Sequence, residues 1–157
     1  MINFNIDDTT FNYRVGSIII DEENKRILLN RDLDKNYWFL PGGRCEAFEF
    51  AKEALAREAK EEMDSEIIID RPVFFIENLF HLKDKKVHEI GIYYLAHFSE
   101  GNPILEKEEF PFDENNRNFL FKWFPLSEIK DLNIQPAILK ERLLNLPAEV
   151  EFIENKE

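Results

Sequence analysis

Three glutamates near the end of one helical segment are the residues of this chain best suited to chemistry. Glu58, Glu61 and Glu62 stand at positions i, i+3 and i+4, and this spacing places their side chains on one side of a helix. Two unit charges about 4 Å apart repel by about 1 kcal/mol in water and about 4 kcal/mol at an effective dielectric constant of 20. A divalent cation would relieve this repulsion, and carboxylate oxygens suit Mg²⁺ and Mn²⁺. We therefore expect a Mg²⁺ site here, with Mn²⁺ as the alternative ion.

The apolar residues of the same segment sharpen this expectation. Each helical residue turns by about 100°, so Ala51, Ala54 and Leu55 share a stripe with the three glutamates. A surface helix normally keeps its charges opposite its apolar stripe, whereas here the acids continue the stripe. The alternative is a solvated acidic helix end without a ligand, and the three glutamates alone leave that alternative open.

A glycine turn stands directly before this helical segment, and residues 40–65 read LPGGRCEAFEFAKEALAREAKEEMDS. Glycine lets a backbone approach a ligand closely and adopt turns that other residues resist. The stretch resembles the Nudix box, which consists of Gly, five residues, Glu, seven residues and then Arg-Glu-aliphatic-x-Glu-Glu-x-Gly-aliphatic. The matching positions are Gly43, Glu49, Arg57, Glu58, Glu61 and Glu62. Asp64 and Ser65 depart from the pattern, and Asp can still adopt the left-handed backbone that the family's glycine supplies.

The resemblance implies a fold, an activity and a set of site residues. It implies the α/β class, with a Nudix-type α/β/α sandwich around a mixed central β-sheet, and we expect residues 1–157 to form a single domain of this type. It implies a metal-dependent pyrophosphohydrolase that cleaves a nucleoside diphosphate linked to another moiety. In the family, the catalytic positions correspond to Glu58, Arg57, Glu49 and Glu61. The metal ligands correspond to Glu58, Glu61, Glu62 and the carbonyl group of Gly42.

Other functions remain open at this point. One is a housecleaning hydrolase that acts on damaged or non-standard nucleoside triphosphates. Another is a non-catalytic, nucleotide-sensing Nudix-like binding module, although the intact glutamates Glu58, Glu61 and Glu62 speak against it. A third is an acidic interaction protein in which the motif is coincidental.

The net charge of −12 raises the question of how an anionic substrate would bind. A surface this acidic argues against long nucleic acids as partners, and it fits a small-molecule nucleotide held through cations and a few arginines. The candidate arginines are Arg14, Arg31 and Arg44, each of which could also be an ordinary surface residue. Trp38 could stack on a base, although an aromatic residue near a strand is commonly part of the core.

A polar segment from Glu106 to Asn118 is expected to form a loop. Some members of the resembled family take an extra base or metal ligand from a loop just before the late strand. Glu109 or Glu114 could fill that role here, and the sequence does not choose between them. The alternative is a loop that is simply solvated.

Composition limits the class of protein further. The 157 residues are 44% hydrophobic and include 15 phenylalanines, which indicates a folded core. With one cysteine, no disulfide can form within the chain, and a reducing cytoplasm fits best. The start of the chain lacks the features of a signal peptide, and no apolar run is long enough to cross a membrane. Apolar strands with exposed edges are compatible with a homodimer.

Hydrophobic periodicity and turn residues predict the elements that position these side chains. We expect strands or extended segments at 13–20, 26–30, 37–40, 66–82, 87–98 and 120–124, with the first two forming a hairpin. The helix that carries the glutamates is expected at 50–63, and a short helical turn at 125–129. A final amphipathic helix should start at Pro136 and bury Ile138, Leu139, Leu143 and Leu144.

Overall fold

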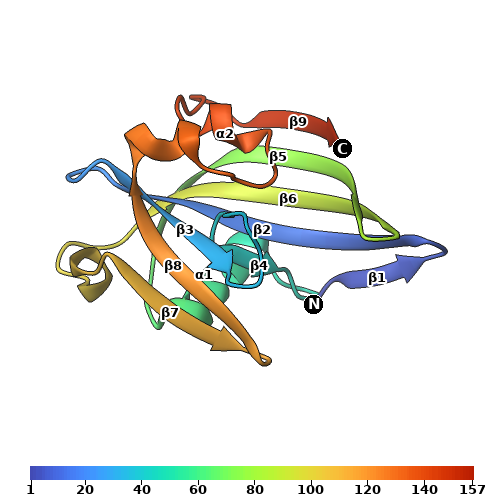
Figure 1. Cartoon of the computed structure of the whole chain (residues 1–157), viewed down its shortest axis with the longest axis horizontal. Helices are drawn as coiled ribbons and strands as arrows, with labels where there is room; N and C mark the ends of the chain where they lie inside the picture. Colours follow the sequence, from blue (N-terminus) through green and yellow to red (C-terminus); the bar gives the residue numbers. More distant parts are fainter.

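The computed structural model describes residues 1–157 and has a mixed β-sheet at its centre (Figure 1). Its nine strands are β1 (Asn3–Ile6), β2 (Thr9–Asp21), β3 (Arg26–Asp32), β4 (Gly42–Arg44), β5 (Ile68–Leu82), β6 (Lys85–His97), β7 (Glu109–Glu114), β8 (Arg117–Pro125) and β9 (Glu151–Lys156). The order along the sheet is β7-β8-β3-β2-β6-β5-β9, and β1 and β4 pair separately with β2. The helices are α1 (Ala51–Met63) and α2 (Leu139–Arg142), with 3₁₀ turns η1 (Pro103–Glu106) and η2 (Leu126–Asp131).

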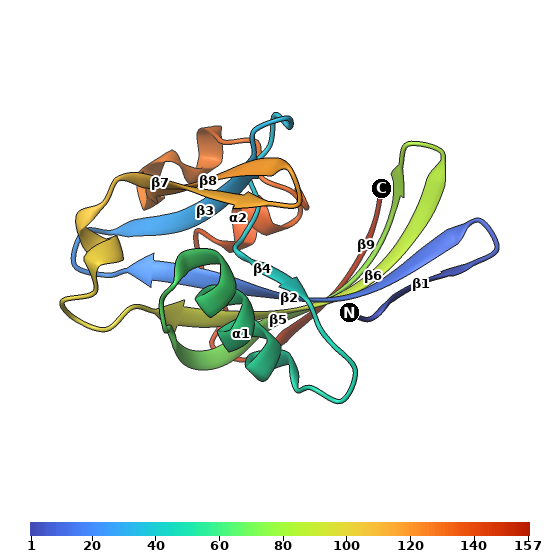
Figure 2. The ribbon, with the colours of Figure 1, turned by 90° about the horizontal axis from the view of Figure 1, so that it is seen from below.

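Helical segments cover both faces of this sheet, which confirms the predicted α/β/α layering (Figure 2). Successive residues of a strand point to opposite faces, and β2 shows this alternation clearly. Ile18 and Ile20 belong to a core cluster with residues of η2 and α2. Val15 and Ile19 point the other way and belong to clusters that include residues of α1.

The site is positioned by a split in the sheet along one edge of β2. At one end, Ile20 of β2 pairs with Ile27 of β3. Further back, the same edge pairs with β4, and Gly16 lies opposite Gly42. A Cβ atom on Gly42 would overlap the backbone carbonyl of Val15, so only glycine allows this close approach. The glycine turn is thereby fixed against β2 at the point where β3 diverges from it.

Helix α1 matches the predicted segment to within one residue. It buries a stripe made of Ala51, Ala54, Leu55, Ala59 and Met63. The side chain of Glu53 accepts a hydrogen bond of 2.8 Å from the backbone N–H of Phe50 and so caps the first turn. At the other end, Asp64 adopts the left-handed conformation, with φ 47° and ψ 37°, as expected for the residue that replaces the glycine of the box.

The prediction of a polar loop from Glu106 to Asn118 is wrong. Residues Glu109–Glu114 form β7, which pairs with β8 as an antiparallel hairpin. Phe110 of β7 stacks on Phe121 of β8 with ring centroids 5.0 Å apart, and this packing holds the strand in place. The strand lies at the edge of the sheet and its outward residues are acidic, so its composition looks like that of a loop.

The predicted final helix is also wrong in length, because α2 is a single turn. Leu139 and Leu143 are buried as expected, but Leu144 is 54% exposed and takes no part in the buried stripe. The short strands β1, β4 and β9 were not among the predicted elements. None of the helices has the length and apolar character needed to cross a bilayer.

Candidate functional site

The carboxylate of Glu58 lies against the glycine turn. A Cβ atom on Gly43 would overlap this carboxylate, so the glycine leaves the space that the side chain fills. The Glu58 side chain is only 14% exposed, and one of its oxygens accepts a hydrogen bond of 3.0 Å from Arg57 Nη1. Burial raises the pKa of Glu58, while the charge and hydrogen bond of Arg57 oppose the rise.

Arg57 fixes Glu49 with the remaining nitrogens of its guanidinium group. Its Nε and Nη2 atoms donate to the two oxygens of Glu49, both at 3.0 Å, in a bidentate arrangement. Nη2 also donates to the backbone carbonyl of Arg44 at 3.2 Å. Glu49 in turn accepts the backbone N–H of Glu46 at 2.9 Å. Glu49 therefore braces the turn, and the hydrogen bond from Arg57 is the main cause of its lowered pKa.

Glu62 is the second buried carboxyl group of the cluster. Burial raises the pKa of Glu62 to about 8, with a further contribution from the negative charge of Glu58 and a smaller opposing one from Arg14. Glu58 is the charged group that raises the pKa of Glu62 most, so the two side chains lie close together. The two groups therefore favour holding a proton between them when no cation is present.

Glu61 departs from the inward stripe that its helical position predicts. Its side chain is 53% exposed and reaches Arg57 Nη1 at 3.4 Å. The helix end thus presents two enclosed carboxyl groups, Glu58 and Glu62, with a third at the solvent boundary.

A fourth acid comes from the β7–β8 hairpin. The charge of Glu114 raises the pKa of both Glu58 and Glu62, which shows that it lies close to them. Glu109 sits at the other end of β7, where it pairs with Lys122 of β8 and is exposed. Of the two acids that the sequence left open, Glu114 is the one that the fold brings to the glutamate cluster.

Arg14 is the predicted arginine that reaches the same cluster. Its Nη2 atom donates to the carbonyl of Leu40 at 3.3 Å, and its guanidinium group interacts with Tyr93 and Glu89 as well as Glu62 and Glu58. Glu89 lies outside the motif and is not among the predicted site residues. A period of two along β6 places Glu89 on the same face as Tyr93, and that signal could have identified it.

The other predicted substrate contacts lie apart from the glutamates. Arg31 stacks over the ring of Trp38 at 5.0 Å, and Trp38 packs edge-on against Phe124 at 4.7 Å and against the core. The Arg44 side chain donates to Met1 Sδ at 3.4 Å. No hydrogen bond or ion pair connects these three side chains with Glu58, Glu61 or Glu62.

The donor set fits a hard divalent cation, although the acids do not already surround one point. No three acidic, histidine or cysteine side chains converge in a ready-made coordination shell. Mg²⁺ usually keeps several waters and takes only one or two carboxylates from the protein, so such a shell is not required. Two enclosed carboxyl groups with raised pKa values are the groups that a cation would convert to their charged forms. Glu58 and Glu62 would hold it, with Glu61 and Glu114 within reach of its waters.

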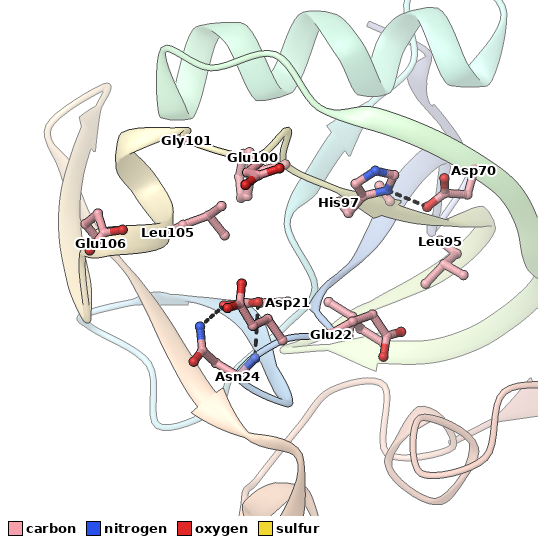
Figure 3. Close-up of a pocket in the computed structure, with 14 residues that line it drawn as sticks. Asp21, Glu22, Asn24, Asp70, Leu95, His97, Glu100, Gly101, Leu105 and Glu106 are labelled. Atoms are coloured by element: carbon pink, nitrogen blue, oxygen red, sulfur yellow. Dashed lines mark hydrogen bonds and ion pairs between the residues drawn. The ribbon is translucent and has the colours of Figure 1, made fainter.

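A separate cavity lies away from this site (Figure 3). It measures about 770 Å³ and lies beside the β2–β3 turn and the end of β6. Among the residues that line this cavity, His97 Nδ1 is 2.9 Å from Asp70 Oδ2. Acidic side chains such as Asp21, Glu22 and Glu100 also line the cavity. None of the predicted site residues lines this cavity. We place the candidate site at α1 because the glycine turn, the buried acids and the guanidinium clamp meet there.

Comparisons with known proteins agree with this fold. The family model of the NUDIX domain matches residues 10–143. A NUDIX hydrolase structure from Nitrosomonas europaea has a TM-score of 0.65 at 19% identity, covering 93% of this chain and 79% of that chain. The MutT protein of Methanosarcina mazei Go1 has a TM-score of 0.62 at 22% identity, covering 88% and 94%. An ADP-ribose pyrophosphatase from Streptococcus suis 89-1591 has a TM-score of 0.58 at 18% identity, covering 91% and 98%. No curated protein sequence matches the chain.

Proposed function

The chain belongs to the Nudix hydrolase family, and from this premise we propose that it is a Mg²⁺-dependent pyrophosphohydrolase cleaving a nucleoside diphosphate linked to another moiety. The observation that carries the proposal is the placement of Glu58. Its carboxylate is seated in the space beside Gly43, is clamped by Arg57 and faces Glu62. In a solvated acidic helix end the carboxyl groups would stay in water, whereas here two of them are enclosed.

Each group near Glu58 has a definite task in such a reaction. Arg57 and Glu49 hold the turn and fix the direction of the Glu58 carboxylate. Glu58 is the proposed acceptor of a proton from the attacking water, because Arg57 holds its carboxylate in a fixed direction. Arg14 supplies positive charge beside the acids and is the group best placed to bind a phosphate oxygen. A bound Mg²⁺ would neutralise phosphate charge and acidify water.

Substitution of the buried acids tests the proposal. Glu58→Gln and Glu62→Gln should each lower kcat by about 10²–10⁴-fold, the range typical of a lost proton acceptor, and leave the fold intact. Glu66→Gln is the matched control, because Glu66 is exposed just beyond the same helix. Circular dichroism and melting curves establish folding. Normal turnover by both variants would show that the roles are misassigned.

The products identify the class of substrate. ADP-ribose, nucleotide sugars, dinucleoside polyphosphates and oxidised nucleoside triphosphates would be assayed with Mg²⁺ and with Mn²⁺, and the products separated by chromatography. We expect a nucleoside monophosphate and a phosphorylated partner. Release of inorganic pyrophosphate from triphosphates, with no cleavage of the diphosphates, would instead identify a triphosphate hydrolase.

A further inference from the structure

A row of polar side chains crosses five strands of the sheet at one level. The strand registers pair Asn3 with Asn12, Asn12 with Glu89, Glu89 with Asn78, and Asn78 with Asn155. These residues come from β1, β2, β6, β5 and β9 in their order across the sheet. The five strands curl away from α1 in Figure 2. Asn12 lies six residues from Ile18 and Asn78 two residues from Ile76, so a period of two places the row on the face of the core cluster that includes residues of η2 and α2, opposite α1. Neighbouring strands thus present a continuous band of amide and carboxylate groups.

Hydrogen bonds connect the row from both ends but leave its centre open. The amide of Asn3 donates to Asn12, and Asn12 Nδ2 donates to Glu89 Oε2 at 3.5 Å. From the other side, Asn155 Nδ2 donates to Asn78 Oδ1 at 2.8 Å. No hydrogen bond joins Glu89 to Asn78. This leaves an acceptor, Glu89 Oε1, beside a donor, Asn78 Nδ2, and neither has a partner in the protein.

Neither unpaired atom is sealed inside the protein. The side-chain atoms that are fully enclosed and lack a hydrogen bond are Asn30 Oδ1 and Arg31 Nε, and neither belongs to the Glu89–Asn78 pair. Asn78 as a residue is only 5% exposed, and the hydrogen bond from Asn155 holds its amide in place. A preorganised donor beside a preorganised acceptor is what a binding site for a polar neutral group requires.

Arg14 links the row of polar side chains with the glutamate cluster. Arg14 is two residues from Asn12 on the same face of β2, which corresponds to about 7 Å along a strand. The negative charges of Glu89, Glu62 and Glu58 all act on its guanidinium group, so Arg14 lies near both the row and the glutamate cluster. A phosphate bound at Arg14 would therefore place the group attached to it over the row.

The chemistry of the pair indicates which group that is. A carboxylate without a cation repels phosphate, so the diphosphate itself belongs at Arg14 and at the cation that Glu58 and Glu62 would hold. The row contains no aromatic ring on which a base could stack. Hydroxyl groups need an acceptor for their hydrogens and a donor for their oxygens, which Glu89 Oε1 and Asn78 Nδ2 supply side by side. Resting on the function proposed above, we propose that Glu89 and Asn78 bind the vicinal hydroxyl groups of a sugar ring joined to the substrate diphosphate.

The test measures binding of product-like probes, so it does not depend on turnover. Calorimetry in Mg²⁺ would give the Kd of AMP, 2′,3′-dideoxy-AMP and ribose 5-phosphate for the wild type, Glu89→Gln and Glu77→Gln. Gln at position 89 can still accept the hydrogen bond from Asn12 but loses the free carboxylate oxygen. Glu77 is the matched control, because it lies one residue from Asn78 on β5, points to the opposite face and is 48% exposed.

We expect Glu89→Gln to weaken AMP, ribose 5-phosphate or both by about tenfold, the effect of losing a hydrogen bond to a charged group. The Kd of 2′,3′-dideoxy-AMP should stay within about twofold of the wild type, because its ring lacks the hydroxyl groups. A loss confined to AMP identifies the nucleoside ribose, and a loss confined to ribose 5-phosphate identifies a sugar in the second moiety. Three results would overturn the inference. The Kd of 2′,3′-dideoxy-AMP could rise as much as that of AMP, Glu89→Gln could change the Kd values no more than Glu77→Gln does, or the wild type could bind none of the probes.

Asn78→Ala provides a second variant that removes the donor at position 78, because alanine has no hydrogen-bonding side chain. It should reproduce the selective loss for hydroxyl-bearing probes, and failure to do so would contradict the inference even if Glu89→Gln proved unstable. Failure of the proposed function can be told apart from failure of the sugar site. If the wild type binds AMP in a hydroxyl-dependent way but cleaves no diphosphate, only the reaction is refuted. If the wild type cleaves diphosphates and Glu89→Gln does so with an unchanged KM, only the sugar site is refuted.

Discussion

The carboxylate of Glu58 occupies the space that a side chain on Gly43 would need. The neighbouring Gly42 faces a different obstacle, since a Cβ atom there would overlap the backbone of Val15. The two glycines therefore serve the site in different ways. Gly43 leaves room for the Glu58 carboxylate, and Gly42 allows β4 to pair with β2.

This difference predicts opposite outcomes for two alanine variants. Gly43→Ala should displace the Glu58 side chain, lower kcat by about tenfold or more, and change the unfolding free energy by less than about 1 kcal/mol. Gly42→Ala should destabilise the fold by about 1–3 kcal/mol, because backbone must move. Urea unfolding and steady-state kinetics measure both effects. Equal losses of stability in the two variants would contradict the assignment.

The stability of the metal-free protein should fall as pH rises. An unfolded glutamate has a pKa of about 4.3, whereas burial raises the pKa of Glu62 to about 8. The folded state thus holds a proton more tightly, so this stabilisation is complete below about pH 4.3 and is lost progressively up to about pH 8. A difference of 1 kcal/mol corresponds to about 2–4 °C in Tm for a chain of this size.

Melting curves between pH 5 and pH 8, with EDTA or with millimolar Mg²⁺, check this prediction. Mg²⁺ should raise Tm most at the alkaline end, where the carboxyl groups are charged. Glu62→Gln should flatten the pH dependence in EDTA. A Tm that is indifferent to Mg²⁺ throughout this range would count against a cation at the cluster.

Arg57→Lys keeps the positive charge but loses the planar fork that grips both oxygens of Glu49 and one of Glu58. We expect kcat to fall by about 10–100-fold, as for other residues that orient a metal-binding group. Lys52→Ala is the control, because Lys52 is exposed on another face of α1. Wild-type kcat in Arg57→Lys would show that charge alone is sufficient.

Asp64→Gly should stabilise the protein by about 0.5–1 kcal/mol. Asp64 ends α1 with a φ of 47°, a conformation that costs a residue with a side chain more than it costs glycine. The substitution also removes the ion pair with Lys60, but that pair is largely exposed and contributes little. Chemical unfolding measures the change, and Asp64→Ala should move it in the opposite direction.

The sequence predicts the centre of the fold better than its edges. The helix at 51–63 and the long strands carry strong periodic patterns and special residues such as Asp64, so their positions follow from local chemistry. Strand β7 escapes prediction because its acidic outward face resembles a loop, and its pairing with β8, including the stack of Phe110 on Phe121, is seen only in the structure. The Glu61 side chain turns toward Arg57 and stays exposed, and helical spacing alone does not predict this contact.

The pairing of β2 with β6 shows why the site cannot exist on its motif alone. These strands run parallel, and Thr9 lies opposite Lys86, so a long stretch of chain must close before any of their hydrogen bonds form. Gly43 is fixed by pairing with Val15 on β2, and the carboxylate of Glu58 fills the space beside that turn. A synthetic peptide spanning residues 40–65 would contain all six matching positions of the signature and still leave its carboxylates hydrated. During refolding, catalytic competence should emerge late, together with the sheet.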